Sequence, residues 1–166
     1  MDILLSFILI MLVTSLQLSV ISRIPMQNGM ADIVLLFLIM WSLHSKAKNF
    51  YIPALFAGGL MAFISALPMP SILLSYIIAG LLIRFLVVRL WEMPIFSMLI
   101  GTILATLVQH IIYILSLQLR GLSIPFLASL QQITLPSIFL NLIFAFPMYL
   151  IVHDAQKLVY QVVENE

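Results

Sequence analysis

The chain consists of long apolar runs that are separated by proline, glycine and a few charges. A helix needs about 20 apolar residues to cross a bilayer, and the first run, residues 3–21, comes close to that length. Only 8% of the 166 residues are charged, whereas soluble domains carry about 25%. So few charges cannot give a globule a polar surface. The sequence therefore predicts an all-α integral membrane protein, with a single multi-pass domain over residues 1–166.

Proline, glycine and charge divide the chain into six expected transmembrane helices that form a compact bundle. Their expected bounds are residues 3–21, 33–43, 51–67, 72–90, 95–117 and 137–152. We interpret the first as a retained helix, since its start carries Asp2 in place of the basic residues of a signal peptide and its apolar run is close to spanning length. Residues 123–134 mix apolar and polar side chains, which predicts a short interfacial helix. Residues 153–166 are expected to form a soluble cytoplasmic tail.

The second expected helix is unusually short. At about 1.5 Å per residue, residues 33–43 cover roughly half of a ~30 Å hydrocarbon core. Such a helix either thins the bilayer locally or lies shielded by other helices. Asp32 is expected to cap it, and Asn49 and Ser71 are expected to cap the third and fourth helices, because such side chains accept hydrogen bonds from free backbone N–H groups.

The distribution of lysine and arginine predicts the orientation, because these residues gather on the cytoplasmic side. With a cytoplasmic N-terminus, most of the seven basic residues fall in inner segments. The inner ones are Lys46, Lys48, Arg84, Arg89 and Lys157, and the outer ones are Arg23 and Arg120. An even number of helices returns the chain to the side on which it started. Both termini are therefore expected in the cytoplasm.

Small residues recur at every fourth position in three of the expected helices. The stripes are Gly58, Ala62 and Ala66; Ser71, Ser75 and Ala79; and Ser97, Gly101 and Ala105. Stripes of this kind let two helices approach closely. Two interpretations stay open, namely internal packing of the bundle and docking of a helix from another subunit. For the second, the candidate partner-binding residues are Gly58, Ala62, Ala66, Gly101 and Ala105.

Few polar side chains fall inside the apolar segments. Arg84 can extend to the inner headgroups, and Arg89 can pair with Glu92 at the same surface. His110 suits a proton relay in principle, but no carboxylate is expected at its depth, so a hydrogen-bonded structural histidine is favoured. Asn141 is expected to form a hydrogen bond between helices.

Motifs of enzymatic chemistry are absent from the sequence. There is no HExxH, no GxSxG and no phosphate-binding glycine loop, and the chain has no cysteine. His44 and His153 are expected near the inner face and His110 near the outer one, so they cannot share a metal ion. We therefore expect no catalytic residues, no cofactor and no metal. The net charge of +1 gives no reason to expect a nucleic-acid partner.

The order of these features resembles the MreD family of bacterial rod shape-determining membrane proteins. The resemblance is carried by residues 31–41 (ADIVLLFLIMW), the basic turn 46–48 (KAK), residues 58–68 (GGLMAFISALP), and the stretch from Asn141 through Pro147 to Tyr149. In the Gly-rich helix the family often has an aspartate where this chain has Ala62, and a glycine where it has Ala66. Any role of that aspartate is therefore not carried over to this chain.

The resemblance implies a non-enzymatic scaffold or regulatory subunit of the cell-elongation (rod) complex in the bacterial cytoplasmic (inner) membrane. It implies MreC as the direct partner, RodA and a class B penicillin-binding protein as members of the same complex, and MreB as an indirect partner. Peptidoglycan synthesis and cell shape would be the processes served.

The family's fold is similar to that of the S subunits of energy-coupling-factor transporters, which supplies the alternative function. Under it, the chain captures a small molecule for transport. Such a subunit needs a cavity with several convergent polar groups. The polar residues expected in the outer segments are Arg23, Gln27, Asn28, Arg120, Gln131 and Gln132.

Overall fold

The computed structural model describes residues 2–23, 29–43, 49–89 and 93–164, which are helical and contain no strand. The elements are α1 (Asp2–Ser19), the 3-10 turn η1 (Ile21–Arg23), α2 (Ile33–Leu43), α3 (Tyr51–Ile64), α4 (Met69–Arg89), α5 (Pro94–Leu119), α6 (Phe126–Ser129), the π-helical segment η2 (Leu130–Thr134) and α7 (Leu135–Glu164). Within the described ranges, three helical segments are long and apolar enough to cross a membrane: α4, α5 and the segment 126–157. The predicted class of an all-helical membrane protein agrees with this.

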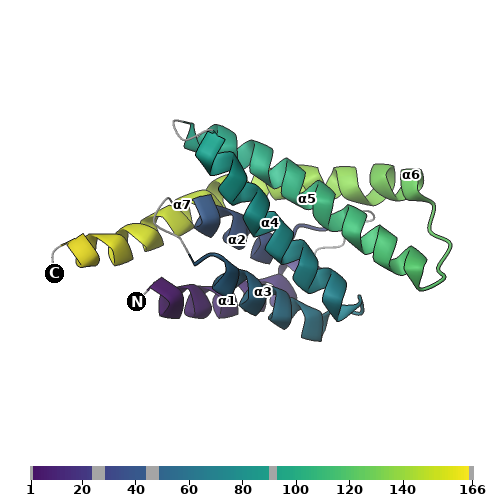
Figure 1. Ribbon diagram of the computed structural model, residues 1–166, viewed down its shortest axis with the longest axis horizontal. Coiled ribbons are helices and arrows are strands. Elements are labelled where there is room, and N and C mark those ends of the chain that lie inside the picture. Colours follow the sequence, from purple (N-terminus) through teal and green to yellow (C-terminus); the bar gives the residue numbers. More distant parts are fainter. Residues whose placement is uncertain (1, 24–28, 44–48, 90–92, 165–166) are drawn as a thin grey trace.

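The short helix α2 forms the centre of the bundle (Figure 1), where it contacts α1, α3, α4, α5 and α7. Every residue from Ile33 to Ser42 is buried. A helix that is apolar on all sides needs a cover on all sides, and the sequence of α2 has no polar face. Of the two interpretations of this short helix, the structure shows the shielded one. Its predicted bounds are confirmed.

Both ends of α2 are satisfied by side chains, because water does not reach a helix end inside a bundle. At the start, Asp32 Oδ1 accepts the N–H of Leu35 at 2.8 Å, and Gln17 Oε1 of α1 accepts the first N–H of α2 at 2.9 Å. At the other end, Gln156 Nε2 of α7 donates to the carbonyl of Trp41 at 3.0 Å. The prediction that Asp32 caps α2 is confirmed.

The boundary between α3 and α4 lies earlier than predicted. α3 ends at Ile64 and not at residue 67, because Ser65 has an extended backbone with φ −85° and ψ 147°. Ala66 therefore lies outside the helix. α4 begins at Met69 and not at residue 72. Pro70 fits the first turn of a helix, where its missing N–H costs no hydrogen bond.

Two of the predicted helix caps are wrong. Phe50, not Asn49, occupies the N-cap position of α3, and its side chain makes no capping bond. Ser71 lies inside α4, where its hydroxyl donates to the carbonyl of Pro68 at 2.6 Å instead of accepting from a free N–H. At the start of α4 the backbone turn at Pro68 sets the boundary. At the start of α3 it is set by the turn that precedes the helix.

The last helix is much longer than predicted. α6 and η2 lead into α7 through residues with helical backbone angles, so residues 126–134 start this helix instead of forming a separate interfacial one. At the other end, α7 continues to Glu164 through the segment predicted as a soluble tail. The predicted end of the last helix at residue 152 is therefore too early, and Gln156, which is 2% exposed, packs against the end of α2. That the segment beyond it is soluble and cytoplasmic stays a prediction. Pro147 lies inside α7.

The start of α1 and the end of α7 lie at the same end of the bundle (Figure 1). That both termini lie on the cytoplasmic side of a membrane stays a prediction. The basic turn 46–48, His44 and Glu92 lie outside the described residues. Arg89, the expected partner of Glu92, stacks over the ring of Phe85 at 5.6 Å.

Candidate functional site

A cavity of about 620 Å³ lies where α3 ends, α4 begins, α5 ends and α7 begins. Its polar lining residues are Asp32, Ser65, Gln109, His110, Tyr113, Ser129, Gln132, Thr134, Ser137 and Asn141. The rest of its lining is apolar apart from Gly29. Pockets that bind small molecules typically measure about 300–1,000 Å³ and combine apolar walls with a few polar groups. The cavity has the size and chemistry of such a site.

The segment that enters α2 forms one wall of the cavity and is held from two sides. The N–H of Met30 donates to Ser137 Oγ at 3.0 Å, and the N–H of Asp32 donates to Asn141 Oδ1 at 2.8 Å. From α1, Gln17 Nε2 donates to the carbonyl of the residue before Asp32 at 2.9 Å. Three polar side chains from α1 and α7 therefore fix the position of Asp32.

Gly29 lets the chain enter this wall. Its φ of 79° lies in the left-handed region, which favours glycine. A Cβ at this position would lie 2.9 Å from Pro136 Cβ and from the backbone nitrogen of Ser137. Both the backbone angle and the close contact with the start of α7 therefore require glycine here.

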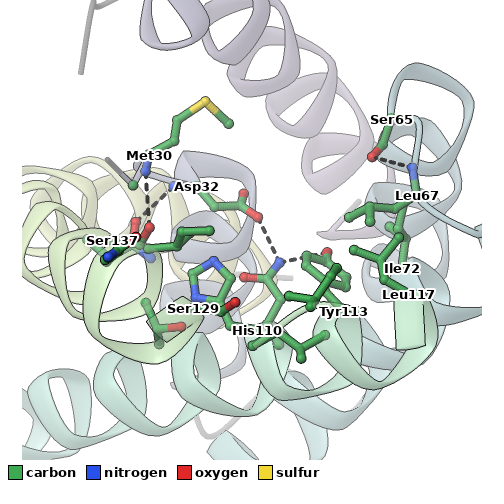
Figure 2. A pocket seen from close by; sticks show the side chains of 18 of the residues that line it. Met30, Asp32, Ser65, Leu67, Ile72, His110, Tyr113, Leu117, Ser129 and Ser137 are labelled. Atoms are coloured by element: carbon green, nitrogen blue, oxygen red, sulfur yellow. Dashed lines mark hydrogen bonds between the residues drawn. The ribbon is translucent and has the colours of Figure 1, made fainter. Parts of the chain in front are cut away.

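The Asp32 carboxylate accepts hydrogen bonds from two further helices. The hydroxyl of Tyr76 in α4 lies 2.9 Å and 3.1 Å from its two oxygens. Gln109 Nε2 in α5 donates to Asp32 Oδ2 at 2.8 Å and to the Tyr113 hydroxyl at 3.0 Å, and Figure 2 shows these last two bonds as dashed lines. Ser75 adds a second side chain of α4 to the network, with 3.3 Å between its hydroxyl and that of Tyr113. A satisfied buried network of this kind holds its members in one geometry.

His110 lies beside this network in the wall of the cavity (Figure 2). Gln109, which precedes His110 in the sequence, donates a hydrogen bond to Asp32. A carboxylate therefore does lie at the depth of His110, and the expectation that none does is wrong. The Nδ1 atom of His110 is buried and has no hydrogen-bond partner in the described part of the chain. The expected hydrogen bond is thus not found at Nδ1, and the ring packs edge-on against that of Tyr113 with centroids 6.3 Å apart.

Asn141 forms the interhelical hydrogen bond that the sequence predicts. Its Nδ2 donates to Thr106 Oγ1 of α5 at 2.9 Å, while its Oδ1 accepts from Asp32. Both its donor and its acceptor groups therefore join α7 to neighbouring segments. Asn141 itself is 1% exposed.

The polar residues of α5 were not predicted as a site, although their spacing carries a signal. Thr102, Thr106, Gln109 and Tyr113 follow one another at intervals of four, three and four residues, which places them on one helix face. Thr102, Thr106 and Gln109 are buried. A polar stripe along an apolar helix indicates a face that is turned away from lipid.

The polar residues expected from the outer segments contribute little to the cavity. Gln132 lines it, whereas Gln131 and Arg120 are exposed and do not belong to its lining. Gln27, Asn28 and the side chain of Arg23 lie outside the described residues.

Two residues of the predicted partner-binding stripes pack against α4 of the same chain. A Cβ on Gly58 would lie 3.3 Å from Tyr76 Cβ and 3.4 Å from Leu73 Cα. Gly101 faces the side chain of Ile83. In this structure both glycines serve close contacts inside the bundle, which is the first of the two interpretations.

The other three stripe residues differ in exposure. Ala105 is 1% exposed and also lies in the core. Ala62 is half-buried in α3, and Ala66 is exposed beyond the end of that helix. Binding of a partner by these residues stays a prediction, and Ala62 and Ala66 are the ones that remain accessible.

Replacement of Gln17 by leucine is expected to lower the free energy of unfolding by about 2–6 kcal/mol. The reason is that two buried backbone groups next to Asp32 lose their partner, at about 1–3 kcal/mol each. Gln118 offers a matched control, because it also donates to a backbone carbonyl at 2.9 Å but is exposed. Denaturant titration of both variants in detergent measures the difference. Equal stability of Gln17→Leu and Gln118→Leu would contradict the role given to Gln17.

Comparisons with protein-family models, with curated proteins and with solved structures find no match for this chain. In the described ranges, no group of three or more histidine, aspartate or glutamate side chains is placed to hold a metal ion. The candidate site is therefore defined by the cavity and by the hydrogen-bond network around Asp32.

Proposed function

We propose that the chain is a non-enzymatic membrane subunit of the bacterial cell-elongation complex, similar to MreD. In this proposal it resides in the inner membrane with cytoplasmic termini and binds MreC. It supports peptidoglycan synthesis by RodA and a class B penicillin-binding protein, with MreB acting indirectly.

One observation carries the proposal beyond the order of motifs. Two of the stretches that resemble MreD, residues 31–41 and the stretch from Asn141 to Tyr149, lie far apart in the sequence but meet in the fold. The N–H of Asp32 donates to Asn141 Oδ1 at 2.8 Å, and α2 contacts α7. The resemblance therefore falls on residues that build one structural unit, which supports its use as a guide to function.

Affinity purification of the tagged full-length chain from native membranes, followed by mass spectrometry, tests this proposal. We expect MreC, RodA and a class B penicillin-binding protein among the recovered proteins. Ala66→Leu, at the exposed candidate position, should reduce the recovery of MreC. Ala128→Leu is the control, because it makes the same change at a small residue outside the stripes, and it should leave the recovery of MreC unchanged. Recovery of none of these proteins would refute the proposal.

The cavity favours a second candidate function, in which the chain captures a small molecule as an S subunit of an energy-coupling-factor transporter does. Its volume of about 620 Å³ and its convergent polar groups match what such a binding site requires. The same purification distinguishes the two. A pair of ATPases with a coupling membrane subunit would support the second function and contradict the first.

A further inference from the structure

The described lining of the cavity contains one acidic side chain, that of Asp32, and no lysine or arginine. The groups that bond the carboxyl group of Asp32 are two backbone N–H groups (Leu35 and Val34), the Tyr76 hydroxyl and the Gln109 amide, which are all neutral. No described group therefore supplies a countercharge when this carboxyl group is ionised. A buried charge is costly unless an opposite charge accompanies it.

Unpaired polar atoms remain in the cavity near this carboxylate. The carboxylate itself has about four lone-pair positions, and these are occupied by the N–H groups of Leu35 and Val34, the Tyr76 hydroxyl and the Gln109 amide, so what it lacks is a countercharge and not a hydrogen-bond donor. Two further lining residues, His110 and Thr134, have a buried side-chain atom (Nδ1 and Oγ1) without a partner among the described residues. Beside the carboxylate, the cavity therefore offers two polar atoms with which a ligand can form hydrogen bonds.

The remaining wall is suited to an apolar body. Met61, Ile72, Ile114, Leu117 and Ile133 line the cavity from α3, α4, α5 and η2. The described ranges place no group of three or more histidine, aspartate or glutamate side chains that could hold a metal ion. An anion would meet Asp32 without a countercharge. The combination of one carboxylate and apolar walls matches an organic cation with a ring or a short hydrocarbon chain.

We propose that the cavity binds a small amphiphilic monocation, with its ammonium group at Asp32 and its apolar body against α3, α5 and η2. The ammonium lies beside the carboxylate and supplies the countercharge that the described lining lacks. This inference goes beyond the proposed scaffold function. It concerns ligand binding by the isolated protein, so it does not depend on which complex contains the chain.

Equilibrium dialysis of the purified full-length protein in nanodiscs tests the inference, with empty nanodiscs as the blank. The probes are naphthylethylamine, the neutral naphthylethanol and the anionic naphthylacetate. We expect saturable binding of the amine to one site, at least about tenfold tighter than binding of the alcohol or the acid, because charge-assisted hydrogen bonds are the stronger ones. Asp32→Asn should reduce the affinity for the amine to that for the alcohol.

A second pair of variants keeps the test independent of the Asp32 network. Leu117→Trp fills the cavity from α5 and should abolish binding of the amine. Leu115→Trp makes the same change on the exposed face of α5, where Leu115 is 48% exposed, and should leave binding intact. Equal binding of all three probes, equal behaviour of the two tryptophan variants, or no saturable binding of the amine would each overturn the inference. None of these results bears on which proteins co-purify with the chain.

Discussion

Replacing Asp32 by alanine is expected to lower the free energy of unfolding by about 3 kcal/mol or more. The change removes the cap of α2, at about 0.5–2 kcal/mol. It also leaves the Tyr76 hydroxyl and one N–H of Gln109 buried without an acceptor, at about 1–3 kcal/mol each. Relief of the desolvation of the carboxylate offsets part of this sum. Because α2 is the centre of the bundle, the loss should appear as global unfolding and not as local fraying.

Two companion variants make this expectation specific. Asp32→Asn keeps an acceptor oxygen for the Leu35 N–H and should cost less than Asp32→Ala. Asp154→Ala removes an exposed carboxylate that pairs with Lys157 at 3.4 Å, and such surface changes stay within about 0.5 kcal/mol. Denaturant titration in detergent, followed by circular dichroism, measures all three. An Asp32→Ala protein as stable as Asp154→Ala would show that the network does not support the fold.

Replacing Gly58 by leucine is expected to destabilise the fold by at least about 1–3 kcal/mol, the usual cost of overpacking. The new Cβ would press on the backbone of α4 at Leu73 Cα, and backbone cannot move aside as a flexible side chain does. Gly59 is the matched control one residue later in the same helix, because a Cβ there meets no described atom within 4 Å. Gly59→Leu should therefore be tolerated.

The glycine pair also separates the two interpretations of the small-residue stripes. If Gly58 serves internal packing, Gly58→Leu lowers the thermal unfolding midpoint of the protein purified alone, and Gly59→Leu does not. If Gly58 instead contacts a partner helix, the protein alone keeps its midpoint and loses only the partner. The midpoints of the two variants, measured without any partner, decide between these outcomes.

The sequence by itself determined the features that depend on local composition. The shortage of charge predicted a helical membrane protein, and the apolar run from Ile33 to Leu43 predicted the bounds of α2. Asp32 was identified as a cap because N-cap chemistry involves only the first turn of a helix. Asn141 was expected to bond another helix because an isolated amide in an apolar segment needs a partner.

Only the tertiary structure decided what these residues meet. Asp32, Tyr76 and Gln109 come from three separate segments, and no spacing along the chain indicates that they share one hydrogen-bond network. The extension of α7 through the predicted tail depends in the same way on Gln156 reaching the end of α2. Hydrogen bonds between distant segments follow from how helices pack around α2, and helix packing depends on shape in three dimensions and not on the order of residues.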